Sequence, residues 1–257
     1  MKSYRGTRER LKPPSRLWIV LITILFLAGI GFLGLFAYDW MQYQKGEQYY
    51  VSLRETVLPQ TKTVAADTAT PESAVDFTAL QSCNPDAAAW LEMPAIEVSL
   101  PVVQAQDDQT YLHLSFDGTA NPNGCLFFAA PQGVDTALYR VIYGHNMHTG
   151  AMFGKLTEYK SESFWQQNPT FTLCTPAGDK ACRIFSCHTA VDGEELYNTN
   201  REAGAEYDAF VQQLRAASLY DTGVDVPSGS QVLTLSTCAT SYSSGTDRFV
   251  VHAVIEP

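Results

Sequence analysis

A cysteine and an arginine near the end of the chain have the types and spacing needed for acyl-transfer chemistry. The run 232–238 (Val-Leu-Thr-Leu-Ser-Thr-Cys) is apolar or β-branched at most positions, which predicts a buried strand that ends at Cys238. Arg248 lies at the start of a second apolar run, 247–255. If the two runs pair, the thiol and the guanidinium face each other at the mouth of a hairpin. A thiolate can serve there as a nucleophile, and a guanidinium can stabilise negative charge on a carbonyl oxygen.

Such a reaction also needs a group that transfers protons, and the chain has five histidines. His145 follows the apolar run 141–143 and a glycine, a sequence that presents a side chain at the end of a strand. We therefore predict that His145 is the proton shuttle, with His148 as the second candidate. The remaining histidines lie within an apolar run or lack a distinctive sequence context: His113, His188 and His252.

Short β-favouring segments separated by turns would position these residues, and they predict a mostly β barrel or sandwich. The segments expected to be strands are 95–103, 124–129, 138–143, 170–174, 181–187, 232–238 and 247–255.

Helices are expected in three places around these strands. Residues 77–83 form a short helix that is interrupted at 84–86 and restarts toward Trp90, because proline suits a first helical turn. A second short helix, 151–156, follows the His145 loop. The Ala-rich segment 201–219 places four apolar residues on one face and predicts a helix just before the cysteine strand.

An uncharged segment, 17–37, separates a basic N-terminus from the rest of the chain. Its 21 residues make a helix of roughly 30 Å, enough to cross a bilayer. Residues 1–16 carry six basic side chains and one acid, which places the N-terminus in the cytoplasm. A cleaved signal peptide is the alternative, but the apolar segment is long and Phe36-Ala37-Tyr38 is a poor cleavage site.

The predicted organisation has four parts. Residues 1–16 are a cytoplasmic basic tail and 17–37 a transmembrane signal anchor, which makes the protein a single-pass protein of the cell membrane. Residues 38–76 are a juxtamembrane helix followed by a spacer rich in Thr, Ala and Val. Residues 77–257 are an extracytoplasmic catalytic domain.

Charge and cysteine content narrow the function classes. Beyond residue 16 the chain holds 11 basic and 26 acidic residues, which argues against binding to nucleic acid. Six cysteines outside the cytoplasm would ordinarily suggest disulfides, and a hairpin turning at Gly178 would set Cys174 opposite Cys182; isolated buried thiols are the other interpretation. No Cys-x-x-C spacing indicates a zinc site, and we expect neither a metal nor another cofactor.

Three segments in chain order carry the candidate residues: 142–147 (Ile-Tyr-Gly-His-Asn-Met), 234–238 (Thr-Leu-Ser-Thr-Cys) and 247–251 (Asp-Arg-Phe-Val-Val). Together they resemble those of the sortases, the membrane-anchored cysteine transpeptidases of Gram-positive cell surfaces. Four features are most similar to class B of this family. They are the serine before Thr237, the sequence Gly-His-Asn-Met, the pair Trp90-Leu91 followed by 100–103, and the helix before the nucleophile strand. The resemblance covers roughly residues 77–257.

This resemblance implies a closed eight-stranded sortase-type β-barrel with peripheral helices and a groove leading to Cys238. It also implies that Cys238 attacks the threonine carbonyl of a C-terminal sorting signal, of Pro-x-Thr type, in secreted proteins. His145 would protonate the departing amine and deprotonate the incoming one, while Arg248 stabilises the oxyanion. The acceptor would be an amine of a peptidoglycan precursor or, in polymerising members, of a pilin.

Two rival functions remain open at this point. The chain could be another cell-wall cysteine peptidase or transpeptidase, such as an L,D-transpeptidase-like enzyme, although that family's Ser-x-Gly-Cys sequence does not occur in it. It could also be a non-catalytic surface module in which Cys238 is structural. Selective alkylation of Cys238 and trapping of a peptide thioester on it would distinguish the enzyme from the module.

We predict a bell-shaped pH dependence of turnover. Reference pKa values of ~8.5 for a thiol and ~6.5 for an imidazole leave only a minority of the enzyme as thiolate and imidazolium at neutral pH. The two limbs of the profile would then belong to the pair of groups. Turnover measured from pH 5 to 10 tests this, and a flat profile would contradict it.

Overall fold

The computed structural model describes residues 15–58, 73–130, 137–193, 195–238 and 246–256, and the chain divides into two compact units, Met1–Gln42 and Tyr43–Pro257. The strands are β1 Ala87–Met93, β2 Val98–Gln104, β3 Leu126–Phe128, β4 Tyr139–Tyr143, β5 Thr170–Thr175, β6 Gly178–Val191, β7 Val232–Cys238 and β8 Asp247–Ile255. The α-helices are α1 Arg16–Val57, α2 Phe77–Cys83, α3 Glu162–Gln167 and α4 Ala205–Ala216. Short 3-10 helices are η1 Pro94–Ile96, η2 Thr110–Leu112, η3 Leu156–Lys160 and η4 Glu195–Tyr197.

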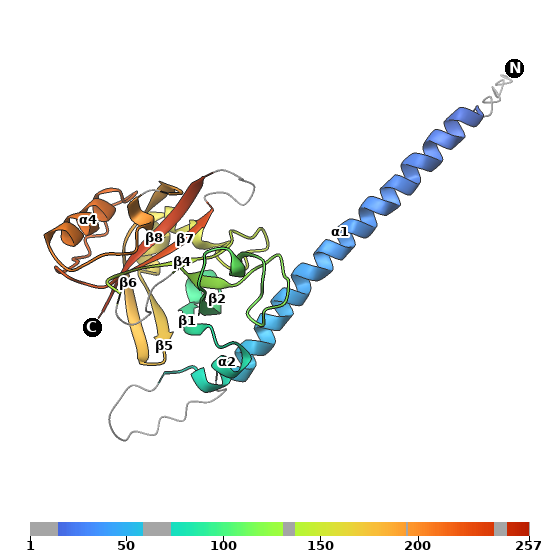
Figure 1. The fold of residues 1–257 in the computed structure, drawn as a ribbon. Coiled ribbons are helices and arrows are strands. Elements are labelled where there is room, and N and C mark those ends of the chain that lie inside the picture. Colours follow the sequence, from blue (N-terminus) through green and yellow to red (C-terminus); the bar gives the residue numbers. More distant parts are fainter. Residues whose placement is uncertain (1–14, 59–72, 131–136, 194, 239–245, 257) are drawn as a thin grey trace, which may run out of the picture. The chain divides into compact units, whose positions relative to one another are not determined.

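The strands of the second unit close into a barrel in the order β1-β2-β3-β4-β7-β8-β6-β5, with β5 pairing back onto β1 (Figure 1). The pairs β2–β3 and β4–β7 are parallel, and the other pairs are antiparallel. The predicted closed, mostly β barrel is therefore confirmed.

Strands β7 and β8 have the bounds that the sequence predicts, and their side chains alternate between two faces. Leu233 and Leu235 of β7 pack with Phe249 of β8 in the large core cluster inside the barrel. Val232 and Val250 belong to a second cluster on the outer face. Cys238, in step with Val232, therefore points to the outer face of the sheet.

Helix α4 covers part of that outer face (Figure 1). It begins four residues later than expected because Gly204 precedes it with φ +146°, and it ends at Ala216. The spacing i, i+3, i+4, i+7 lines up its buried residues Tyr207, Phe210, Val211 and Leu214 on one side. Each such burial contributes about 1.5–3 kcal/mol, which explains why the helix docks here.

The prediction that the helix 77–83 restarts toward Trp90 is wrong. Asn84 ends α2 in an extended conformation and its side chain accepts a hydrogen bond from the amide N–H of Asp86 at 2.9 Å. The chain then enters β1, which pairs with both β2 and β5. Pairing on two sides outweighs the helical propensity of the three alanines at 87–89.

The short helix predicted at 151–156 is also absent from the structure. Met152 adopts a left-handed conformation with φ +52°, which ends any α-helix at that residue. A 3-10 helix, η3, follows instead, and it buries Leu156 and Tyr159 beside Phe153. Phe153, Leu156 and Tyr159 are therefore completely buried without an α-helix at 151–156.

The hairpin between β5 and β6 turns at Pro176-Ala177, earlier than the expected turn at Gly178. Thr175 pairs with Gly178, so that Cys174 lies opposite Asp179 and Cys182 lies opposite Phe171. Cys174 and Cys182 therefore do not form the disulfide that the sequence left open. All six cysteines lie in the described part of the chain, and all are free thiols.

Helix α1 has an exposed apolar part and a packed part. Its residues 17–37 are exposed, and it is the one helix among the described residues that is long and apolar enough to cross a membrane. In the second unit, Tyr50, Leu53 and Val57 are buried in the core, and the Tyr50 hydroxyl donates to the Gly124 carbonyl at 2.8 Å. The compact unit thus includes helical residues that the sequence analysis assigned to the juxtamembrane segment, while most of the expected spacer, 59–72, lies outside the described residues.

His252 of β8 is completely buried beside β7. Its Nδ1 lies 2.7 Å from the Thr234 hydroxyl, which in turn donates to the Tyr139 hydroxyl at 3.0 Å. Its ring stacks on His188 of β6 with 5.0 Å between centroids, and Nε2 has no hydrogen-bond partner among the described residues. Burial, and secondarily the charge of His188, hold the pKa of His252 well below its usual range.

This buried imidazole predicts that stability falls in mild acid. The unfolded chain takes up a proton on His252 below pH ~6.5 and the folded chain does not, so the free energy of unfolding falls by up to about 1.4 kcal/mol per pH unit. Urea unfolding at pH 7.5, 6.5 and 5.5 measures this slope. His252→Gln should reduce the slope, whereas the exposed control His148→Gln should keep it; an unchanged slope in His252→Gln would contradict the assignment.

Candidate active site

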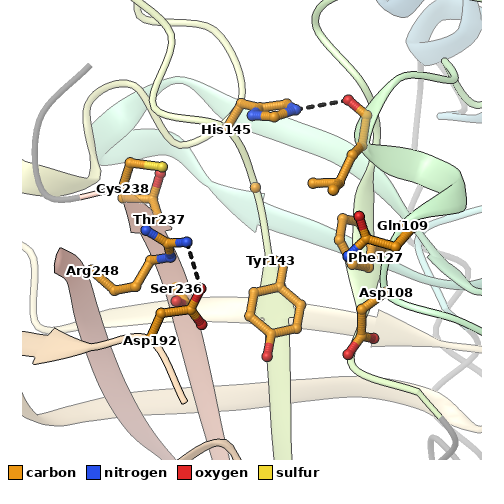
Figure 2. Close-up of a pocket in the computed structure, with 12 residues that line it drawn as sticks. Asp108, Gln109, Phe127, Tyr143, His145, Asp192, Ser236, Thr237, Cys238 and Arg248 are labelled. Atoms are coloured by element: carbon orange, nitrogen blue, oxygen red, sulfur yellow. Dashed lines mark hydrogen bonds and ion pairs between the residues drawn. The ribbon is translucent and has the colours of Figure 1, made fainter. Parts of the chain in front are cut away.

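A cleft of about 360 Å³ opens at one end of strands β4, β7 and β8 (Figure 2). The three predicted site residues, Cys238, His145 and Arg248, all line it. Asp192 and Arg248 lie on one wall, Asp108 and Gln109 on the other, and Tyr143 lies between the walls (Figure 2). The sequence-predicted residues are therefore brought together in one cavity.

Cys238 and Arg248 are direct cross-strand neighbours in the β7–β8 ladder. Paired side chains at such positions lie about 5 Å apart at Cβ, close enough for one substrate group to contact both. Cys238 is partly exposed, as a nucleophile must be. Arg248 is about one-fifth exposed, so its charge is only partly screened by water.

The buried thiols are poor alternatives to Cys238. Burial raises the pKa of Cys125 and of Cys182 to about 12, so both stay protonated at neutral pH. Burial also raises the pKa values of Cys174 and Cys187. Cys83 is exposed, but it ends helix α2 and does not line the cleft.

His145 reaches the cleft because β4 runs parallel to β7. Tyr143 pairs with Ser236, and the Gly144 amide extends the ladder by donating to the Ser236 carbonyl at 3.1 Å. A Cβ at residue 144 would lie 2.5 Å from a methyl carbon of Leu126 and 2.6 Å from the Phe153 ring, so only glycine fits before His145.

The imidazole of His145 is oriented by a backbone carbonyl. Its Nε2 lies 2.7 Å from the carbonyl oxygen of Leu112 (Figure 2). A carbonyl can only accept, so Nε2 carries the hydrogen and Nδ1 is the nitrogen that can take up a proton. His113 stacks beside it with 6.3 Å between centroids. The second candidate, His148, is exposed and does not line the cleft.

Two further polar residues of the site, Asp192 and Asn146, are not among those predicted from the sequence. Asp192 forms an ion pair with Arg248, with 2.7 Å between Oδ2 and Nη2. Asn146 donates from Nδ2 to the Cys238 carbonyl at 2.7 Å. Asp192 lies in an Asp-Gly turn at the end of β6 and Asn146 directly follows the predicted histidine, but neither signal reveals which strand will lie beside it and supply its partner.

Asn146 links the histidine loop to the end of the cysteine strand. It forms an isolated bridge with Met152, and the Phe153 amide donates to the His145 carbonyl at 2.9 Å. The loop is therefore closed on itself at its base while its Asn146 side chain holds the last carbonyl of β7. The positions of His145 and Cys238 are thus coupled.

Tyr197 covers the part of the outer face next to the cleft. Its hydroxyl lies 3.0 Å from the Ser236 hydroxyl and its ring stacks on Tyr143 at 5.9 Å. Burial, followed by the charge of Asp108, raises the pKa of Tyr143, so this phenol stays protonated and is no base.

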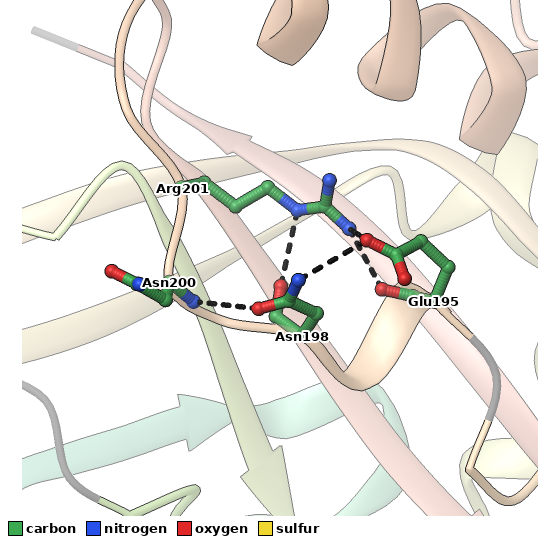
Figure 3. A network of polar contacts seen from close by, with 4 residues as sticks. All are labelled: Glu195, Asn198, Asn200 and Arg201. Carbon is green, nitrogen blue, oxygen red and sulfur yellow. Dashed lines mark hydrogen bonds and ion pairs between the residues drawn. The ribbon is translucent and has the colours of Figure 1, made fainter.

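Arg201 holds the segment that carries Tyr197. Its Nη2 donates to the Glu195 carbonyl at 2.7 Å and its Nε to the Asn198 carbonyl at 3.0 Å (Figure 3). Asn198 also contacts the Glu195 carboxylate and the Asn200 amide (Figure 3). The guanidinium stacks on Phe210 of α4 at 3.6 Å, which fastens this segment to the helix.

Comparisons with known proteins agree on one family. A family model described as Sortase domain matches residues 91–256. Sortase B of Staphylococcus aureus is 26% identical over 180 residues, covering 70% of this chain and 74% of that protein. Sortase B of Listeria monocytogenes is 27% identical over 213 residues, covering 80% and 86%.

Solved structures give the same result. A sortase B from B. anthracis superposes with a TM-score of 0.73 at 27% identity, covering 84% of this chain and 98% of that one. Sortase B of Clostridium perfringens gives a TM-score of 0.66 at 27% identity, covering 71% and 100%.

Because the Asn146 side chain donates to the Cys238 carbonyl, we predict that removing this side chain slows turnover. Asn146→Ala removes one hydrogen bond to the Cys238 carbonyl, worth about 1 kcal/mol, so kcat/KM should fall roughly five- to tenfold. Steady-state kinetics measure this. Asn200→Ala, which alters an asparagine remote from Cys238, is the control and should keep the native rate. An Asn146→Ala variant as active as the native protein would show that the contact is unimportant.

Proposed function

The chain belongs to the sortase family, and we propose that Cys238, His145 and Arg248 carry out its transpeptidation on secreted proteins at the cell surface. The protein is a cysteine transpeptidase most similar to the class B sortases. One observation supports these residue roles most: the thiol and the guanidinium are cross-strand neighbours in a cleft that also holds an oriented imidazole.

In the first step the Cys238 thiolate attacks the threonine carbonyl carbon of a Pro-x-Thr sorting signal. Negative charge develops on the carbonyl oxygen, where Arg248 supplies a positive partner. The protonated imidazole of His145 gives its Nδ1 proton to the departing amine as the C–N bond breaks. The products are a thioacyl enzyme and the released C-terminal fragment.

In the second step an acceptor amine attacks the thioester. Neutral His145 takes the proton that this amine loses, the new amide bond forms, and the Cys238 thiolate leaves. The acceptor is an amine of a peptidoglycan precursor or a pilin lysine. No cofactor takes part in either step.

The exposed apolar part of α1 supports attachment to the membrane. Residues 17–37 would span the bilayer as a signal anchor, with the basic residues 1–16 in the cytoplasm. The compact unit 43–257, whose core includes Tyr50, Leu53 and Val57, would be the extracytoplasmic catalytic domain. With this topology the cleft would lie on the side of the membrane where secreted proteins and cell-wall precursors meet.

We expect a soluble form, residues 43–257, to cleave peptides of Pro-x-Thr type after the threonine and to form a thioester on Cys238. Mass spectrometry of a small peptide library identifies both products. Cys238→Ala should abolish cleavage, and Arg248→Lys should lower kcat by about 10²-fold because an ammonium cannot reproduce the planar donor set.

The exposed Cys83 provides a matched control, since Cys83→Ala should retain full activity. Cleavage that persists in Cys238→Ala, or an adduct on Cys83, would refute the proposed nucleophile. Cleavage of peptides whose threonine is replaced, at the native rate, would refute the proposed signal.

A further inference from the structure

We propose that Asp192 is a positioning residue for Arg248, whose guanidinium it holds at the edge of the cleft beside Cys238. This inference rests on the proposed function, because it assumes that Arg248 acts on the substrate. It assigns a role in the reaction to a residue outside the sequence-predicted site.

The barrel register brings Asp192 to Arg248. In the β6–β8 ladder Ala190 lies opposite Arg248 and Val191 opposite Asp247. The Asp192 amide extends the ladder by donating to the Thr246 carbonyl at 2.7 Å. Asp192 is therefore the diagonal neighbour of Arg248 on the same face, at a separation that long side chains span. The methyl group of Ala190 leaves room for the arginine to cross.

The guanidinium is held from two directions. Its Nη2 contacts Asp192 Oδ2 at 2.7 Å, and its Nη1 donates to the Asp247 carbonyl at 3.3 Å. Contacts at both terminal nitrogens restrict rotation of the planar group. An arginine side chain loses rotamer entropy when it is ordered, so this restraint reduces the ordering that substrate binding must supply.

The ion pair has little value for stability alone. The two side chains are 22% and 48% exposed, and ion pairs in such positions contribute little to the free energy of unfolding. A fixed donor matters more in catalysis, because a preorganised positive group stabilises a developing oxyanion without reorganising. The geometry thus favours a role in the rate over a role in folding.

The other carboxylates near the cleft are placed differently. Asp108 lies on the opposite wall (Figure 2) and accepts a hydrogen bond from the Ala130 amide at 2.7 Å. The Asp247 side chain is exposed and does not line the cleft, and its backbone carbonyl accepts the hydrogen bond from Arg248 Nη1. Asp247 therefore offers a matched control that removes a nearby negative charge without releasing Nη2.

A double-mutant cycle tests the proposal, with single-turnover acylation of Cys238 followed by mass spectrometry. Asp192→Asn should lower the acylation rate about tenfold, with a smaller change in KM, because a looser guanidinium weakens transition-state stabilisation. In an Arg248→Ala background the same change should have no further effect. Asp247→Asn should acylate at the native rate. Thermal unfolding of each variant verifies folding.

Equal losses from Asp192→Asn in both backgrounds, or native acylation in Asp192→Asn, would overturn the positioning role. If Arg248→Ala itself acylates at the native rate, the role of the arginine in the proposed function fails and this inference fails with it. Loss of activity in Arg248→Ala with none in Asp192→Asn leaves the proposed function standing and rejects only the role of Asp192.

Discussion

Backbone hydrogen bonds between β7 and β8 set Cys238 opposite Arg248, and the rest of the site is arranged around this pair. Side chains alternate along a strand, so a slip of one residue would turn the thiol into the barrel core. The register is fixed on both faces. Leu233 and Leu235 pack inside, and the hydroxyls of Thr234 and Ser236 have hydrogen-bond partners outside.

Cover over the outer face of β7 decreases along the strand. Helix α4 packs near Val232, the imidazole of His252 contacts Thr234, and Tyr197 covers Ser236. These three residues of β7 are each at most 1% exposed. Cys238, the next residue on this face, is partly exposed among the residues that the structure describes. Strand β7 is thus buried at Val232, where α4 packs on it, and partly exposed at Cys238, where it reaches the cleft.

Much of this could be predicted from local sequence. Seven of the barrel's strands correspond to predicted segments, with β7 and β8 matching at both ends, because each is a run of apolar and β-branched residues. Strand β1 was missed because its alanines carry no β signal and its two partners lie elsewhere in the chain. The meeting of Cys238, His145 and Arg248 in one cleft could be predicted because each lies at or just beyond a strand end. Asp192 and Asn146 could not, because their contacts depend on strand order.

Strand order also explains why the site has its width. In the barrel, β4, β7, β8 and β6 are successive neighbours, and the residues at one rim follow in the same order: His145, Cys238, Arg248 and Asp192. Neighbouring strands lie about 4.8 Å apart, so the strands carrying His145 and Arg248 flank that of Cys238 at one spacing each. Strands β4 and β8 are thus about 10 Å apart with β7 between them, so a group bound at Cys238 would have the guanidinium on one side and the imidazole on the other. Asp192, one strand further out, can hold the arginine without entering that space.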